Sequence, residues 1–114
     1  MPKQTDPDTY LPLKPASFHV LLALADGPRH GASIREAVAT LTRGAVTLWP
    51  VTLYGSIREL DEARLIEPVP DGDEDARRRS WRLTRLGARV LAAETARLRA
   101  IVEHAERARA VSRA

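Results

Sequence analysis

The stretch LWPVTLYGSIRELDEARLIEPV, residues 48–69, joins a helical pattern directly to a strand-like one. Pro50 suits the first turn of a helix, where the N–H that proline lacks would have no intrahelical partner. Three apolar residues then repeat at i, i+4 and i+7: Leu53, Ile57 and Leu60. This spacing predicts a helix over 50–63 with one buried face. The β-prone residues 64–70 follow at once, so the chain must accommodate a short helix that leads straight into a strand.

Downstream, the pattern predicts a β-hairpin and then a long helix. Residues 71–79 (DGDEDARRR) form a charged loop, and residues 80–84 (SWRLT) form the returning strand. Thr84 is a good N-cap, and the chain after it has no proline. An apolar stripe runs along the segment 85–114: Leu86, Val90, Leu91, Leu98, Ile101 and Val102. A helix about 40 Å long outruns the core of so small a domain, so we expect its stripe to pair with a second copy of the same helix. The alternative is a frayed tail.

Upstream, the sequence predicts two more helices. Residues 1–14 are polar and proline-rich, which indicates a flexible arm. A helix begins at Pro15 and stops at the turn-rich DGPRHG, residues 26–31. A second helix over 31–42 has the apolar stripe Ile34, Val38 and Leu41. The short β-prone AVTL at 45–48 leaves room for one small strand.

The elements thus follow in the order helix, helix, small strand, helix, hairpin. This is the layout of a winged helix-turn-helix domain over 15–84, mainly α with a small β-hairpin, followed by a long C-terminal helix over 85–114. The third helix is short enough to lie in a major groove about 12 Å wide, and the hairpin tip is then the wing that reaches the flanking backbone.

Charge is distributed unevenly along the 114 residues. Residues 1–76 carry seven Lys or Arg and twelve Asp or Glu, whereas residues 77–114 carry eleven arginines and three glutamates. A polyanionic partner and a merely solvated helix face explain this asymmetry equally well.

Several classes of site and segment are not expected. The chain has no cysteine, and its histidines (His19, His30 and His104) show no metal-ligand spacing, so we expect neither a metal nor a cofactor. No apolar run approaches the ~20 residues that span a bilayer, and the start lacks signal-peptide features, which favours the cytoplasm. No serine, histidine and acid form a convincing set and no glycine loop fits a phosphate, so no enzyme is predicted.

Three segments resemble the PadR-type transcriptional regulators: FHVLLALADGPRHGASI (18–34), VTLWPVTLYGSIRELDEARLI (46–66) and RRRSWRLTRLGARVL (77–91). The family landmarks are the Leu-Tyr pair at 53 and 54, the His-Gly pair at 30 and 31, and Leu-Thr…Gly at 83, 84 and 87. The resemblance implies a bacterial homodimeric repressor with an N-terminal winged helix domain. The short tail resembles the subgroup with a single C-terminal dimerisation helix.

Two residues depart from the family pattern. Ala32 stands where the family often has tyrosine, which removes one phosphate contact from the second helix. Arg64 stands where the family usually has glycine, at a position that often needs a positive φ. Arginine there costs about 1 kcal/mol, so either the helix end is strained or the helix runs on.

The candidate DNA-binding residues lie on the third helix and the wing: Thr52, Tyr54, Arg58, Arg77, Arg78 and Arg79. A helical wheel with Leu53 inward turns Val51, Gly55 and Arg58 outward, and Thr52 and Tyr54 lie in the first turn, where recognition helices meet bases or phosphates. The resemblance favours a phosphate contact for Tyr54 over a purely packing role.

Arg58 either reads a guanine or a phosphate, or it pairs with Glu62. Gly55 either lets DNA approach the backbone closely or is simply tolerated. The wing arginines are expected on phosphates, each adding about 0.9 to the slope of log K against log salt. The acidic residues before them, Asp73, Glu74 and Asp75, are expected to oppose DNA binding.

The two tryptophans are expected to pack rather than bind. Trp81 is assigned to the core, and Trp49 to a hydrophobic brace before the third helix. The sequence does not locate a site for a small-molecule effector.

The function predicted is a homodimeric, sequence-specific DNA-binding regulator that represses its own or a neighbouring operon. The two reading helices would enter successive major grooves about 34 Å apart on a pseudo-palindromic operator. Dimerisation is assigned to Leu91, Leu98, Ile101 and Val102. The alternative is a winged-helix protein–protein adaptor that dimerises through its C-terminal helix.

Overall fold

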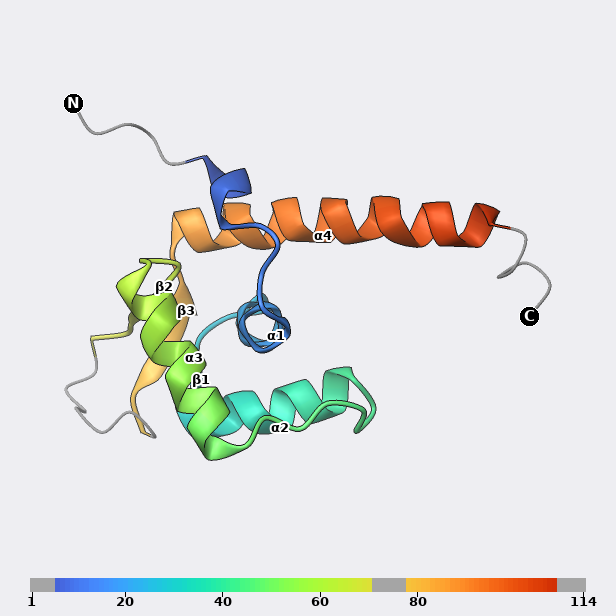
Figure 1. Cartoon of the computed structure of the whole chain (residues 1–114). Helices are drawn as coiled ribbons and strands as arrows, with labels where there is room; N and C mark the ends of the chain where they lie inside the picture. The colour runs from blue at the N-terminus through green and yellow to red at the C-terminus, as the bar shows by residue number, and fades with distance from the viewer. Residues whose placement is uncertain (1–5, 71–77, 109–114) are drawn as a thin grey trace, which may run out of the picture.

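The computed structural model describes residues 6–70 and 78–108. Its elements are η1 (Pro7–Tyr10), α1 (Pro15–Ala23), β1 (Arg29–His30), α2 (Gly31–Leu41), α3 (Pro50–Glu62), β2 (Ile66–Pro68), β3 (Ser80–Leu83) and α4 (Arg85–Arg107). In Figure 1, α1 lies at the centre, with α2 below it, α3 beside it and α4 above it. This arrangement confirms the predicted fold class, a mainly helical winged helix with a small sheet and a long last helix.

The sheet is antiparallel, with strand order β1-β3-β2. Its first strand corrects the prediction, because residues 45–48 form a loop and the small strand is Arg29–His30, immediately before α2. In the loop, the backbone N–H of Val46 donates to the Thr42 hydroxyl at 3.1 Å, and Leu48 is buried. β-prone residues form a strand only where a neighbouring strand supplies hydrogen bonds, and β3 offers that edge to β1.

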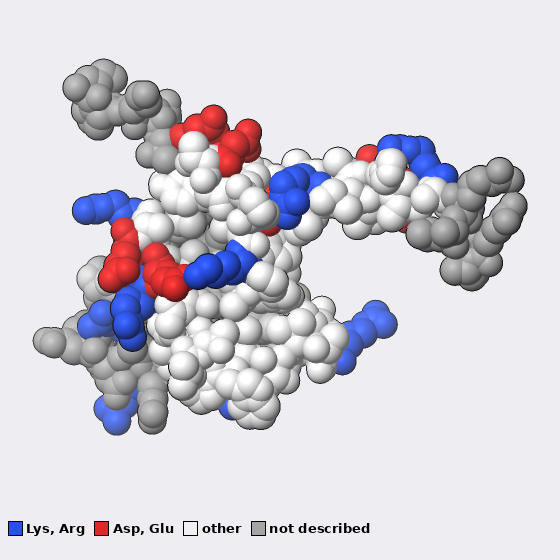
Figure 2. All heavy atoms as spheres, in the orientation of Figure 1, with Lys and Arg blue, Asp and Glu red and all other residues white. Residues whose placement is uncertain are grey.

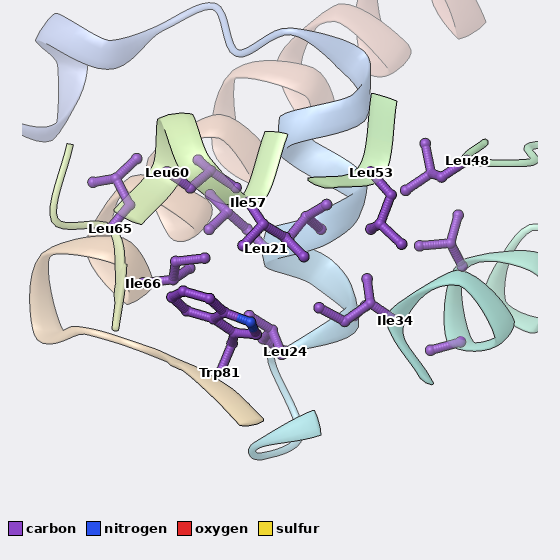
Figure 3. Packing of buried hydrophobic residues seen from close by; sticks show 14 of the residues in the cluster. Leu21, Leu24, Ile34, Leu48, Leu53, Ile57, Leu60, Leu65, Ile66 and Trp81 are labelled. Atoms are coloured by element: carbon purple, nitrogen blue, oxygen red, sulfur yellow. The ribbon is translucent and has the colours of Figure 1, made fainter. Parts of the chain in front are cut away.

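The core forms where the helices and the sheet meet around α1 (Figure 3). Its largest fully buried apolar residues include Leu21 of α1, Ile34 of α2, Leu53 of α3, Leu65 and Ile66. The predicted buried faces of α2 and α3 are confirmed with one exception. Leu41 ends α2 and is 52% exposed, because this end of α2 extends past α1 (Figure 1).

The backbone at the end of α3 shows whether the helix stops at Arg64 or continues past it. The N–H of Arg64 donates to the carbonyl of Asp61 at 3.0 Å, and the N–H of Leu65 donates to that of Leu60 at 2.9 Å. These two bonds are those of a Schellman motif, whose residue after the cap is left-handed. Arg64 has φ 63°, so the helix ends there with a strained arginine and does not run on.

Part of the predicted flexible arm is ordered. Residues 1–5 lie outside the described part, but Tyr10, Leu11 and Leu13 pack against the core. The N–H of Leu13 donates to the Glu94 carboxylate of α4 at 2.9 Å. The segment is held because its apolar side chains cover part of α4 and of the core that would otherwise face water.

The start of α4 is fixed to the end of α3 through Thr84 and Gly87. The Thr84 hydroxyl accepts the N–H of Gly87 at 2.9 Å, as predicted for an N-cap, and donates to the carbonyl of Arg64 at 2.7 Å. A Cβ at Gly87 would stand 1.8 Å from the carbonyl oxygen of Leu65, so only glycine permits this approach. From this anchor, α4 extends about 35 Å and projects beyond the domain (Figure 1).

Candidate nucleic-acid interface

The N-terminal end of α3 carries an exposed apolar surface. Trp49 precedes the helix and is 63% exposed, so the prediction that it braces the core is wrong. The guanidinium carbon of Arg35, from α2, lies 5.0 Å from the centroid of the Trp49 ring. The indole therefore stacks with a cation at the surface, while Leu48 just before it enters the core.

The outward face of α3 matches the helical wheel. Val51 is 88% exposed, and Thr52 and Arg58 are also exposed. Gly55 lies between Val51 and Arg58 on this face, and a Cβ there would meet nothing within 4 Å. Within the described residues no ion pair joins Arg58 to Glu62, so the Arg58 guanidinium is not held by that partner.

Tyr54 lies where α3 meets the sheet. It is half-buried and packs against the core, which is compatible with both roles considered for it. Together with Arg58, Arg79 and Trp81 it lines a shallow cavity of about 240 Å³. Ile57 and Asp61 complete the lining, so the cavity carries one carboxylate beside two guanidinium groups. The fold thus brings the Tyr54 hydroxyl and the Arg58 guanidinium of α3 close to the guanidinium of Arg79, which is more than 20 residues further along the chain.

Arg79 is held at the base of the wing. Its guanidinium carbon lies 5.6 Å from the centroid of the Trp81 ring, and its carbonyl accepts the N–H of Gly31 at 3.2 Å. Trp81 is buried, as predicted. Arg78 is exposed beside it. Arg77 and the acidic residues Asp73, Glu74 and Asp75 lie outside the described residues, so those predictions remain untested.

Acidic side chains of α3 are confined to its C-terminal half. Its first turn has none, and its acidic residues are Glu59, Asp61 and Glu62. Glu59 pairs with Lys14 at 3.2 Å. On the face shown in Figure 2, red side chains lie over η1 and the upper part of α3, and the lower edge shows none. The surface around the start of α3 therefore suits a polyanion.

The predicted dimerisation residues divide into two groups. Leu91 is buried in the core of its own chain, whereas Leu98 is half-buried and Ile101 and Val102 are about half exposed. Leu98, Ile101 and Val102 follow i, i+3, i+4 and so share one face of α4. An adjoining groove of about 420 Å³ lies along α4, with alanines at 25, 88, 92 and 96 in its lining.

A buried carboxylate links α4 to the N-terminal segment. Glu94 is 2% exposed and pairs with Arg97, three residues on. The hydrogen bond from Arg97 lowers the pKa of Glu94 below its ordinary value, burial opposes this shift, and the N–H of Leu13 adds to it. Glu94 also lines a cavity of about 340 Å³ with Phe18 and His19.

The described part of the chain holds neither a candidate metal cluster nor a membrane-spanning helix. Across residues 6–70 and 78–108, no three His, Asp or Glu side chains gather in a way that could hold a metal ion. The helices in the same ranges are too short or too polar to cross a membrane.

Comparison with known proteins gives one family. The model of the transcriptional regulator PadR-like family matches residues 20–93. An uncharacterized 37.1 kDa protein of a Streptomyces fradiae transposon is 37% identical over 79 residues, which are 69% of this chain. The chain spans 21% of that relative's length.

Solved structures share the fold at low identity. A transcriptional regulator from Clostridium thermocellum superposes with a TM-score of 0.66 at 20% identity, covering 82% of this chain and 87% of that one. RosR from H. salinarum gives a TM-score of 0.62 at 18% identity, covering 91% and 87%. At these identities the superpositions establish the winged helix fold, and the family match establishes the class of regulator.

Proposed function

The chain belongs to the transcriptional regulator PadR-like family, and we propose that it is a homodimeric, sequence-specific repressor. Family members are DNA-binding regulators and not enzymes. The finer proposal is that α3 enters the major groove while the wing arginines contact phosphates. The observation that carries it is the arrangement of Tyr54, Arg58 and Arg79 around one cavity between α3 and the wing.

Each of these side chains has a role that follows from its chemistry. The guanidinium groups of Arg58 and Arg79 and the hydroxyl of Tyr54 are donors suited to phosphate oxygens. Stacking on Trp81 restricts Arg79, so less side-chain entropy is lost when a phosphate binds. Thr52 and the outward residues of α3 are left to contact base edges, and Arg77 and Arg78 extend the phosphate contacts along the wing.

The dimer is proposed to form through α4. Leu98, Ile101 and Val102 leave an apolar stripe on a helix that projects away from the domain. Burying about half of each of these side chains against a second copy supplies roughly 1 kcal/mol per residue. Since α4 lies on the far side of α1 from the start of α3 in Figure 1, pairing there leaves both α3 helices free to bind DNA.

Repression follows from occupancy of a promoter. Two α3 helices about 34 Å apart would cover successive major grooves of a pseudo-palindromic operator. A small-molecule effector, if this regulator has one, would act by changing the spacing between the winged helix domains of the two chains. We place the protein in the bacterial cytoplasm, where its operator is accessible.

Binding to random-sequence duplex DNA at several salt concentrations tests this function. Arg79→Ala should weaken binding and reduce the slope of log K against log salt by about 2 per dimer, because each phosphate contact contributes about 0.9. Fluorescence anisotropy with a labelled duplex measures both quantities.

Arg89→Ala is the matched control, because Arg89 is exposed on α4, away from the wing. It should leave the slope unchanged. A wild-type protein that binds duplex weakly and without salt dependence would instead support the protein–protein adaptor.

A further inference from the structure

We propose that Val51 is a specificity residue that reads the 5-methyl group of a thymine in the major groove, with Trp49 adding apolar surface beside it that does not depend on the base. The inference rests on the proposed DNA-binding function and deepens it. Trp49, Pro50 and Val51 are consecutive and all exposed, and they form one apolar tip at the start of α3. The sequence alone does not reveal this tip, because a tryptophan is normally expected to pack in the core.

The exposure of this tip has no explanation in the packing of residues 6–70 and 78–108. Val51 is 88% exposed, so folding gains almost nothing from its two methyl groups. A single exposed apolar residue is ordinary, but Trp49, Pro50 and Val51 are three consecutive exposed residues that together form an apolar patch. Such patches mark surfaces that become buried against a partner.

The charges around the tip identify the partner as nucleic acid. Arg35 stacks on Trp49, and Arg58 lies two turns from Val51 on the same face of α3. No acidic residue occupies the first turn of α3. An apolar protein surface would gain nothing from these cations, whereas a duplex presents phosphates on both sides of the groove.

The chemistry of valine selects one base. Valine can neither donate nor accept a hydrogen bond, and the only apolar group that bases present in the major groove is the 5-methyl of thymine. Gly55, between Val51 and Arg58, leaves the helix surface without a side chain and so lets the base edges come close. The outward face of α3 therefore presents the apolar Val51, the uncovered backbone at Gly55 and the cationic Arg58 within about 10 Å along the helix axis.

The test uses the duplex most enriched by the full chain from a randomised library. Each thymine is replaced in turn by deoxyuridine, which removes only the methyl group. At one thymine position in each half-site, this replacement should weaken the binding of the wild-type protein about fourfold, as expected for the loss of one methyl contact. Val51→Ala should bind the thymine and deoxyuridine duplexes within about twofold of each other. Trp49→Ala should weaken both duplexes equally and keep the ratio.

Leu41→Ala is the matched control, because Leu41 is an equally apolar exposed residue at the far end of α2. It should keep the full thymine preference. Methyl-insensitive binding by the wild type, or an unchanged preference in Val51→Ala, overturns the inference and leaves the proposed function intact. If the library yields no enriched duplex, both fail. Thermal melting of Val51→Ala confirms that it folds, as its exposure predicts.

Discussion

Arg64 is a strained residue at the end of α3. Its φ of 63° is left-handed, a conformation that costs a residue with a Cβ about 1 kcal/mol or more. The two Schellman hydrogen bonds and the burial of Leu65 hold it there. Arg43 repeats the arrangement at the end of α2, with φ 54°.

Arg64→Gly should therefore raise the free energy of unfolding by about 0.5–1 kcal/mol, since glycine adopts this conformation without a Cβ clash. Urea denaturation followed by circular dichroism measures the difference. Arg89→Gly, in the regular part of α4, should instead lower stability by about 1 kcal/mol. Equal effects at the two positions would contradict the strain at Arg64.

Glu94 makes stability depend on pH. Its pKa is lowered in the folded chain, so its contribution is complete above the ordinary value of 4.5 and is lost as the pH falls below it. Glu94→Gln should cost about 1–3 kcal/mol at pH 7 and less at pH 3. Denaturant melts of both proteins at the two pH values give this difference.

The control for this pH effect is Glu103→Gln, an exposed carboxyl on the same helix. Its difference from wild type should be small and the same at both pH values. A Glu94→Gln cost that did not shrink in acid would show that the carboxylate charge contributes nothing to folding.

At the scale of elements, Gly87 sets the distance between α4 and the end of α3. Gly87→Ala should lower the free energy of unfolding by at least about 2 kcal/mol, because the new Cβ would clash with the backbone of Leu65. Gly55→Ala is the matched change in open space and should stabilise α3 by about 1 kcal/mol. Thermal melts of the two variants should thus move in opposite directions.

Gly55→Ala also separates the two interpretations of that glycine. If DNA approaches the backbone there, the variant binds duplex more weakly although it is more stable. Unchanged affinity would mean that the glycine is only tolerated.

The helices could be predicted from sequence because their signals are local. Pro15, Pro50 and Thr84 mark three starts, as observed, and apolar spacing gives the buried faces of α2 and α3 with Leu41 as the exception. The small strand was misplaced because pairing is not local. β1 is two residues long and exists only through its hydrogen bonds to β3, about 50 residues away.

The candidate site was predictable only in part. Arg58, Arg79 and Tyr54 were identified by type and by resemblance, but their convergence on one cavity depends on how the sheet packs against α3. The exposure of Trp49 runs against the general tendency of apolar side chains to be buried. The signal that could have found it is the tryptophan at the N-cap of α3, a position that polar residues normally occupy.

At the scale of the whole molecule, two surfaces lie on opposite sides of α1. The start of α3 and the base of the wing, on one side, present cations and an apolar tip, and α4, on the other side (Figure 1), presents a separate apolar stripe. Ile101→Asp would place a charge in the α4 stripe without touching the core, since Ile101 is about half exposed. We expect this variant to be a folded monomer that binds the enriched duplex at least about tenfold more weakly. In the dimer, binding of one DNA-binding domain holds the second at a high effective concentration near its half-site, and the monomer lacks this advantage.

Sedimentation velocity of the labelled, enriched duplex with micromolar protein tests the central claim most directly, because it counts chains on DNA. The account predicts one dominant complex with two chains per duplex, and little of a complex with one chain. A duplex that carries a single chain at saturation, or that sediments unchanged, would contradict it.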